Sequence, residues 1–239
     1  MLPKLSHPSY EVKIPSNKKI YKFRPYTVKE QKFLLMMQDS DSIDDLTRCI
    51  TDLIESCSLT PISTDKLTYF DIEYLFLKIR SKSVGESSTV SYKCNNQIDG
   101  ELCDTVNELE ISLDDVEVSF ENSIPGEIKL TEDIFIKLKY PNAKSAKALE
   151  LYNVTKDIDY LTEAINEDLE SIMDSEKIYD DFTQEELKEF LNSLDLTVFK
   201  NILQYYINTP KLTKNVQFKC RKCDYSETII LSGLSDFFV

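Results

Sequence analysis

The sequence predicts an α+β fold with a helical N-terminal half, because the spacing of its apolar residues changes several times along 239 residues. After an N-terminal hairpin, apolar residues recur at helical spacing from about Thr27 to Arg80 and then alternate with polar residues from Ser87 to Tyr140. Helical spacing returns from Ala143 to Asn208, and two strand patterns follow. Separate helical and strand stretches of this kind are typical of the α+β class.

Composition indicates a folded protein that stays in the compartment where it is made. Hydrophobic residues make up 41% of the chain and charged residues 29%, as in a globular domain with a sizeable core. No run approaches the roughly 18 apolar residues of a membrane-spanning helix, and the N-terminus lacks the apolar core of a secretory signal. In a reducing compartment, the six cysteines are expected to be thiols or metal ligands rather than disulfides.

Charge is unevenly distributed along the chain, whose formal net charge is −14. Residues 1–40 carry eight basic and three acidic side chains, whereas residues 150–195 carry three basic and fifteen acidic ones. An acidic chain repels phosphate backbones, so nucleic-acid binding is not expected. The acidic segment is interpreted as a solvated helical face, with a surface for a basic partner as the alternative.

The first segment, residues 1–87, predicts a β-hairpin and three helices. Alternating apolar residues on both sides of a Pro-Ser-Asn turn predict the hairpin. Thr27 and Glu30 have the spacing of a capping box, which begins a helix through Phe33–Met37. Two more helices are expected over about 42–57 and 68–80. The apolar run Phe33–Met37 is assigned to the core, with an interface as the alternative.

Three further segments follow, without an internal repeat. Residues 88–141 are β-rich, and an antiparallel meander is the expected arrangement. Residues 142–212 predict an acidic helical insertion with a second capping box at Thr183–Glu186. A helix over 198–206 is expected to end before Pro210 and is assigned to the core, with an interface as the alternative. Residues 213–239 return to a strand pattern.

Four of the six cysteines share one layout. Eight residues separate Cys94 from Cys103, two separate Cys220 from Cys223, and each pair lies between two strand-like runs. Zinc in structural sites is held tetrahedrally by two such thiolate pairs. The sequence therefore predicts a zinc-ribbon-like module formed by two distant pairs, with 213–239 packing on 88–141. Such a zinc would be structural, because four protein thiolates leave no coordination position for water.

Local charge supports the zinc interpretation, and spacing leaves alternatives open. The basic residues at 93, 219, 221 and 222 would offset the negative charge of zinc bound by four thiolates. The first spacer exceeds the usual length of about two to four residues, although Asp99-Gly100 can turn within it. Two unconnected cysteine pairs, or a redox site, are the alternatives. Cys49 and Cys57 lie on an apolar helical stripe and are interpreted as core residues.

Catalytic patterns are sparse, so we expect neither an enzyme nor a small-molecule substrate. His7 is the single histidine, and the four glycines form no phosphate-binding loop. The acid pairs Asp180-Asp181 and Glu185-Glu186 lie in charged, solvated sequence. A hydrolase that uses carboxylates alone is the alternative.

Two stretches are specific beyond their composition. The first is Tyr21–Glu30 followed by Phe33–Met36, and the second is Leu67–Glu86. The other positions that belong with them are Leu2-Pro3, Cys57, Cys94 and Lys139-Tyr140-Pro141. Together they resemble the baseplate hub and hub-assembly protein family of T-even-type contractile-tailed bacteriophages. The resemblance covers residues 1–141 well and the last thirty weakly, and the acidic helical region adds nothing to it.

The resemblance implies a structural or assembly protein of the phage tail baseplate hub, whose partners are other baseplate hub proteins. It implies a location in the host cytoplasm during assembly, followed either by retention in the virion tail baseplate or by release, as for a chaperone-like assembly factor absent from the mature virion. A cellular zinc-ribbon adaptor of the transcription or translation machinery is a further alternative, which the acidity of the chain opposes. The resemblance implies no catalytic residue.

Overall fold

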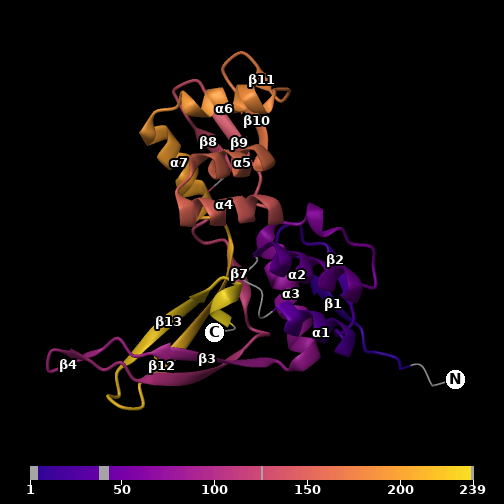
Figure 1. The fold of residues 1–239 in the computed structure, drawn as a ribbon, viewed down its shortest axis with the longest axis vertical. Helices are drawn as coiled ribbons and strands as arrows, with labels where there is room; N and C mark the ends of the chain where they lie inside the picture. The colour runs from indigo at the N-terminus through magenta and orange to yellow at the C-terminus, as the bar shows by residue number, and fades with distance from the viewer. Residues whose placement is uncertain (1–4, 38–42, 125, 238–239) are drawn as a thin grey trace.

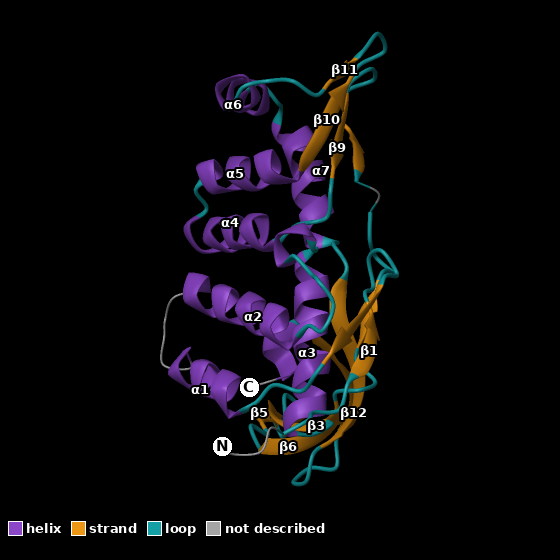
Figure 2. Ribbon diagram, turned by 90° about the vertical axis from the view of Figure 1, so that its right-hand side faces the viewer, coloured by secondary structure: helices purple, strands orange, loops and turns teal. Residues whose placement is uncertain are grey.

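The computed structural model describes residues 5–37, 43–124 and 126–237. The molecule is elongated, with two helix-containing lobes and a long β module that extends from the lower one (Figure 1). In the view of Figure 2, helices α1, α2, α4 and α5 lie along one side and most strands along the other. The α+β class and the helical N-terminal half are confirmed.

Residues 5–85 form the N-terminal lobe, which has the predicted order of elements. Strand β1 (Tyr10–Lys13) pairs with β2 (Ile20–Phe23), and this hairpin packs on two helices around the buried side chains of Ile14, Phe23 and Ile54. The helical elements are α1 (Val28–Met37), α2 (Ile43–Cys57), the 3₁₀ turn η1 (Thr64–Lys66) and α3 (Tyr69–Val84).

The caps predicted for these helices are present. Glu30 reaches back to the backbone N–H of Thr27 at 2.7 Å, and the hydroxyl of Thr68 accepts a hydrogen bond from the N–H of Asp71 at 3.3 Å. Each bond provides an acceptor for a backbone N–H at the start of a helix, where no acceptor within the helix is available.

The assignment of the α1 apolar run to the core is wrong for Phe33 and Leu35. Phe33 is 55% exposed and Leu35 52%, whereas Leu34 is half-buried. The buried face of α1 instead carries Glu30, which accepts hydrogen bonds from Arg24 at 2.9 Å and Ser56 at 2.9 Å. This polar network sets the rotation of the helix and turns Phe33 outward. The side chains of Met36 and Met37 lie outside the described part of the structure.

The ribbon module comprises residues 87–119 and 211–237. Two hairpins form it, one from β3 (Ser87–Lys93) and β6 (Val106–Ser112), the other from β12 (Lys211–Lys219) and β13 (Ser226–Ser232). Its remaining elements are β4 (Gln97–Ile98), β5 (Glu101–Leu102), β7 (Glu117–Ser119) and the C-terminal 3₁₀ helix η2 (Leu234–Phe237).

The expected meander over residues 88–141 is wrong. Strand β7 pairs with β12, more than 90 residues later, while β8 (Glu127–Lys129) and β9 (Phe135–Leu138) join a different sheet. Strand preference depends on the neighbours that a strand finds rather than on its own residues. Strands from the second half of the chain pair with β7 and β9, so the segment that the alternating pattern predicts as one sheet is distributed over separate sheets.

Residues 127–207 form the acidic lobe. Its sheet has the order β11-β10-β9-β8, and helices cover it around Leu161, Ile165 and Ile202. Its other elements are α4 (Ala143–Thr155), α5 (Ile158–Asp168), β10 (Leu169–Met173), β11 (Ile178–Tyr179), α6 (Gln184–Asn192) and α7 (Leu196–Ile207).

The acidic lobe is mostly but not wholly helical. The expectation of an acidic helical insertion misses β10, which pairs Ile172 with Ile136 of β9, and the two-residue strand β11. The capping box at Thr183, the end of α7 before Pro210 and the core position of α7 are confirmed, since Ile202, Tyr205 and Tyr206 are buried. The four segments predicted from sequence remain a proposal for the domain organisation. Strands β8 and β9, which lie in the second predicted segment, pack in the hydrophobic cluster of the acidic lobe.

Aromatic residues join the acidic lobe to the N-terminal lobe. The Tyr140 ring lies edge-on to Phe70 of α3, with ring centroids 5.5 Å apart, and is parallel to Tyr205 of α7 at 6.5 Å. The backbone N–H of Tyr69 donates to the carbonyl of Pro141 at 2.7 Å. The start of α3 is thus fixed directly to the chain that enters the acidic lobe.

Candidate metal centre

Each hairpin of the ribbon module ends in a turn that carries two cysteines. Lys93 pairs with Val106 at the end of the first hairpin, and Cys94 follows immediately. Lys219 pairs with Ser226 in the second hairpin, and Cys220 follows it. Because the hairpins pack against each other, residues more than 100 positions apart meet at one end of the module.

The four sulfur atoms lie at the separations that tetrahedral zinc requires. The Sγ atoms of Cys94 and Cys223 are 3.7 Å apart, those of Cys103 and Cys220 are 3.8 Å apart, and all four lie within 4.8 Å of one another. A tetrahedron with Zn–S bonds of 2.3 Å has S···S edges of about 3.8 Å. Disulfide sulfurs are only about 2.05 Å apart, and all six cysteines are free thiols. The cluster therefore fits a zinc ion bound by Cys94, Cys103, Cys220 and Cys223.

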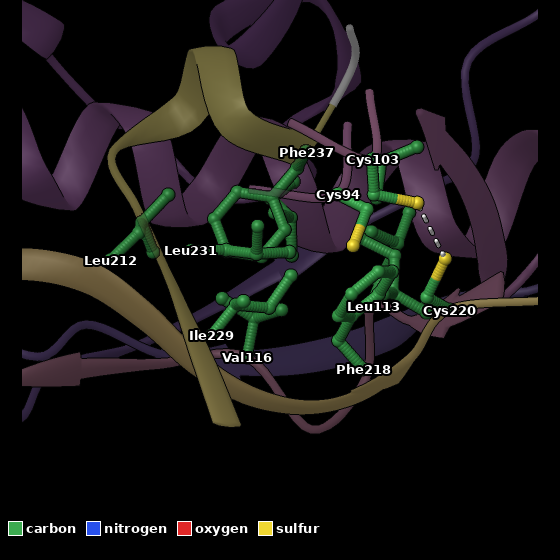
Figure 3. Close-up of a cluster of buried hydrophobic side chains, with 13 residues drawn as sticks. Cys94, Cys103, Leu113, Val116, Leu212, Phe218, Cys220, Ile229, Leu231 and Phe237 are labelled. Atoms are coloured by element: carbon green, nitrogen blue, oxygen red, sulfur yellow. Dashed lines mark hydrogen bonds between the residues drawn. The ribbon is translucent and has the colours of Figure 1, made fainter. Parts of the chain in front are cut away.

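Three of the four thiols are shielded from solvent. Cys94, Cys103 and Cys220 are buried and Cys223 is half-buried. Figure 3 shows the sulfurs of Cys103 and Cys220 facing each other, with Cys94 beside them and the apolar side chains of Leu113 and Phe218 close by. Such a closed set of four thiolates leaves no open coordination position, so a metal held here is structural and not a site for activating water.

Hydrogen-bond donors surround the sulfurs. Two asparagine amides face them, Asn96 Nδ2 at 3.7 Å from Cys223 Sγ and Asn107 Nδ2 at 3.8 Å from Cys220 Sγ. The backbone N–H of Lys222 donates to Cys220 Sγ at 3.4 Å. Donors of this kind stabilise thiolates and orient metal ligands.

The Cys94 and Cys220 thiols differ in acidity. Burial raises the pKa of the Cys94 thiol to about 12. Burial also acts to raise the pKa of Cys220, but the backbone N–H groups of Lys222 and Cys223 outweigh it and lower this pKa to about 6. Adjacent thiolates repel each other, so the cluster keeps protons on some sulfurs until a cation replaces them.

Two of the lysines that the sequence suggested as counter-charges, Lys93 and Lys219, form ion pairs with aspartates. Lys93 Nζ lies 3.1 Å from Asp104, and Lys219 Nζ lies 3.1 Å from Asp224. Each lysine is therefore partly neutralised by the aspartate that follows the second cysteine of its own turn. The expectation that these lysines offset the thiolate charge is weakened, and amide and backbone N–H groups supply the direct contacts to sulfur.

The two cysteine turns are built alike. Each has the order Lys-Cys, spacer, Cys-Asp, with the aspartate in the left-handed region at φ 53° for Asp104 and 56° for Asp224. In both turns the backbone N–H of the first cysteine donates to the carbonyl of the residue two positions after the second cysteine, which is Thr105 or Tyr225. The carbonyl of the first cysteine accepts a hydrogen bond from the backbone N–H of the aspartate.

This correspondence is a local internal repeat that the sequence analysis missed. The first spacer is longer because it forms the small hairpin β4–β5, whose turn residues Asp99 and Gly100 both have positive φ, as a two-residue type I′ turn requires. The repeated Lys-Cys and Cys-Asp dipeptides are the signal that could have revealed it.

The structure brings together all four predicted ligands and leaves the other cysteines elsewhere. Cys57 is fully buried in the N-terminal lobe, whereas Cys49 is only half-buried. Asn107 was not predicted, since a polar residue in an alternating strand resembles a solvent-facing position. It is only 4% exposed.

The residues weighed for catalysis lie at the surface, but two other carboxylates do not. His7, Asp180, Asp181 and the pair Glu185-Glu186 are exposed. Glu73 and Asp168 are buried, at 8% and 1% exposure, and burial raises the pKa of each to about 7. They lie in different surroundings, Glu73 accepting the N–H of Leu234 and Asp168 lying near Tyr206.

Comparison with known proteins gives one match. No curated protein and no solved structure matches the chain. A family model described as the T4 bacteriophage base plate protein matches residues 7–239, which includes the acidic lobe that the resemblance had left out. Among the described residues, no helix combines the length and apolar content needed to cross a membrane. With nearly its whole length matched, the chain belongs to the T4 bacteriophage base plate protein family.

Proposed function

We propose that this chain is a structural or assembly protein of the phage tail baseplate hub, and that Cys94, Cys103, Cys220 and Cys223 hold one structural zinc ion in it. The observation that carries the baseplate role is the family match over residues 7–239, which spans both lobes and both cysteine turns. The observation that supports the zinc is the set of S···S separations of 3.7 and 3.8 Å.

In the proposed role, the protein acts through contacts with other baseplate hub proteins and not through catalysis. Its metal site is closed, and its single histidine lies exposed in the N-terminal stretch. Exposed apolar side chains such as Phe33 and Leu35 on α1 are suited to protein contact. Family membership also favours this role over a cellular zinc-ribbon adaptor.

Two versions of the role differ in where the protein finishes. A structural component is present in the host cytoplasm during assembly and then in the virion tail baseplate. A chaperone-like hub assembly factor is present only in the cytoplasm. Both need the same folded protein and the same zinc, so a particle experiment separates them.

The test is to tag the chain in infected cells, isolate assembly intermediates and mature particles, and blot both for the tag. Co-purification with hub proteins from intermediates is expected in either version. A signal in mature particles indicates a structural component, and its loss from them indicates an assembly factor. Absence from both intermediates and particles, with the protein folded and expressed, would contradict the proposal.

A further inference from the structure

Residues of α6 and of the hairpin β10–β11 line an open groove of about 360 Å³. These elements lie at the end of the molecule opposite β3, the strand that leads to the first cysteine pair (Figures 1 and 2). This volume is at the lower end of the roughly 300–1,000 Å³ of ligand clefts. The floor of the groove is apolar and belongs to the core of the acidic lobe. Its apolar residues are Ile134, Ile172, Phe182, Leu187 and Phe190.

The charged side chains that line the groove are all acidic: Asp174, Asp181 and Glu186. Asp174 accepts hydrogen bonds from the Tyr179 hydroxyl at 2.7 Å and from the N–H groups of Glu176 and Lys177 at 2.8 Å. The Tyr179 hydroxyl and these N–H groups lower the pKa of Asp174. The N–H and hydroxyl of Thr183 lower the pKa of Glu186. Both carboxylates therefore stay ionised at neutral pH.

The lysines near the groove already have partners. Lys188 of α6 pairs with Asp159 at 2.8 Å. Lys177 lies over the Tyr179 ring, 4.3 Å from its centroid. The negative rim is thus only partly balanced by Lys177, in a lobe where acidic residues far outnumber basic ones.

From this combination we infer that the groove binds a segment of a partner protein in which a bulky apolar side chain is flanked by lysine or arginine. The apolar side chain covers the floor, where its burial is favourable, and the flanking cations pair with Asp174, Asp181 and Glu186. Charge complementarity of this kind sets the choice and orientation of a partner. The inference deepens the proposed baseplate function, and it rests on that function only for the existence of a protein partner.

The experiment measures peptide binding to the full-length protein by fluorescence anisotropy. The probe is a fluorescein-labelled Lys-Lys-Phe-Lys-Lys peptide, compared with Lys-Lys-Ala-Lys-Lys and Glu-Glu-Phe-Glu-Glu. We expect the phenylalanine peptide to bind about tenfold more tightly than the alanine peptide, and binding to weaken at high salt.

Two charge-reversal variants distinguish binding in the groove from attraction by the overall negative charge of the acidic lobe. Asp181→Lys changes a rim residue, whereas Glu189→Lys changes an exposed residue of α6 outside the groove and alters the net charge equally. Asp181→Lys should weaken binding of the phenylalanine peptide about fivefold, and Glu189→Lys should weaken it much less. Circular dichroism checks that both variants stay folded.

Four outcomes would overturn the inference: no binding of the phenylalanine peptide, equal binding of the alanine peptide, equal binding of the glutamate peptide, or equal weakening by both variants. Self-association would also overturn it. The chain's own Lys18-Lys19-Ile20 turn has similar chemistry, with Ile20 58% exposed. If the wild-type protein forms oligomers and Asp181→Lys is monomeric, the occupant of the groove is a second copy of this chain. None of these results alters the particle blot, so failure here is distinct from failure of the baseplate role.

Discussion

Asn107 connects the two cysteine turns at the level of a single side chain. Its Oδ1 accepts the N–H of Arg221 at 2.9 Å, and its Nδ2 donates to the carbonyl of Thr105 at 2.9 Å and faces Cys220 Sγ at 3.8 Å. A buried amide with all these contacts fixes the position of a ligand without touching the metal.

Asn107→Ala should therefore weaken zinc retention about 10- to 100-fold, as loss of a ligand-orienting group typically does. Competition with a chromophoric chelator measures the affinity. Gln217→Ala is the control, because the exposed Gln217 bonds only across the hairpin, to Thr228 at 2.8 Å. Equal affinities for wild type and Asn107→Ala would contradict this role.

The ligand set itself is tested by comparing two cysteine variants. We expect purified protein to contain about one zinc per chain, and Cys223→Ser to lose most of it, because a serine hydroxyl is a poor replacement for a thiolate. Cys49→Ser, at a half-buried thiol outside the cluster, should keep the metal. Elemental analysis gives both contents. Folded wild-type protein without any metal would refute the zinc site.

Asp168 makes stability depend on pH. It lies at the end of α5, and within the described part of the chain neither of its carboxylate oxygens has a hydrogen-bond partner. The Ser145 and Tyr206 hydroxyls lie close by. Burial raises its pKa from 3.8 to about 7. The folded state therefore keeps a proton between about pH 4 and 7 that the unfolded state loses, and the free energy of unfolding falls as pH rises through this window.

Asp168→Asn should remove this decrease in stability and stabilise the protein at pH 8 relative to wild type, by on the order of 4 kcal/mol. Urea unfolding of both proteins at pH 5, 6, 7 and 8 measures the difference, in which effects of pH on the thiols cancel. Asp180→Asn, at an exposed acid of the same lobe, controls for the loss of one charge. A difference that does not grow with pH would contradict the assignment.

At the scale of elements, the two cysteine turns differ mainly in the inserted hairpin β4–β5. The ring of Tyr92 before the first turn contacts that of Phe218 before the second, with centroids 4.7 Å apart, so the turns match in position as well as in hydrogen bonding. The apolar residues of the inserted hairpin, Ile98 and Leu102, are exposed. The insertion therefore adds surface without adding core.

Replacing residues 95–102 by Arg-Lys, the spacer of the second turn, should leave a site that still binds about one zinc per chain. The loss of Asn96 removes a donor to Cys223 Sγ, so a modest decrease in affinity is expected. Zinc content and chelator competition measure both effects. Complete loss of zinc in a folded variant would show that the two turns are not equivalent.

Local signals made most helices predictable, and long-range pairing limited the rest. The caps at Thr27, Thr68 and Thr183 depend on residues three positions apart, so the sequence contains them in full. The β7–β12 pairing depends on a partner more than 90 residues away. Strand β11 has two residues, too few to show a period.

The same distinction applies to the candidate site. The cysteine pairs and the strand patterns on both sides of each pair predict the four candidate ligands, because two thiols between neighbouring strands are a local feature. The contribution of Asn107 depends on the second hairpin, which brings Arg221 and Cys220 to it. A single sequence contains no sign of that contact.

At the scale of the whole molecule, three hydrophobic clusters share few residues. Tyr74 contacts the clusters of both the N-terminal lobe and the ribbon module, whereas the cluster of the acidic lobe is separate. The acidic lobe contacts the N-terminal lobe through the rings of Phe70, Tyr140 and Tyr205 and through the packing of α4 on α2 and α3. Metal removal should therefore act on one part of the molecule before the others.

Hydrogen exchange with and without a chelator tests this. Structural zinc contributes on the order of 10–16 kcal/mol in small zinc modules, and a whole domain is stable by only about 5–15 kcal/mol. Removing zinc should thus abolish amide protection in β3, β6, β12 and β13, while α5 and α7 keep theirs because their core contains no cysteine. Added zinc should restore the lost protection, and magnesium should not. Equal loss of protection in every element would contradict this expectation and mean that the protein unfolds as one cooperative unit. The aromatic contacts of Tyr140 would then couple the two lobes as strongly as the metal couples the two hairpins.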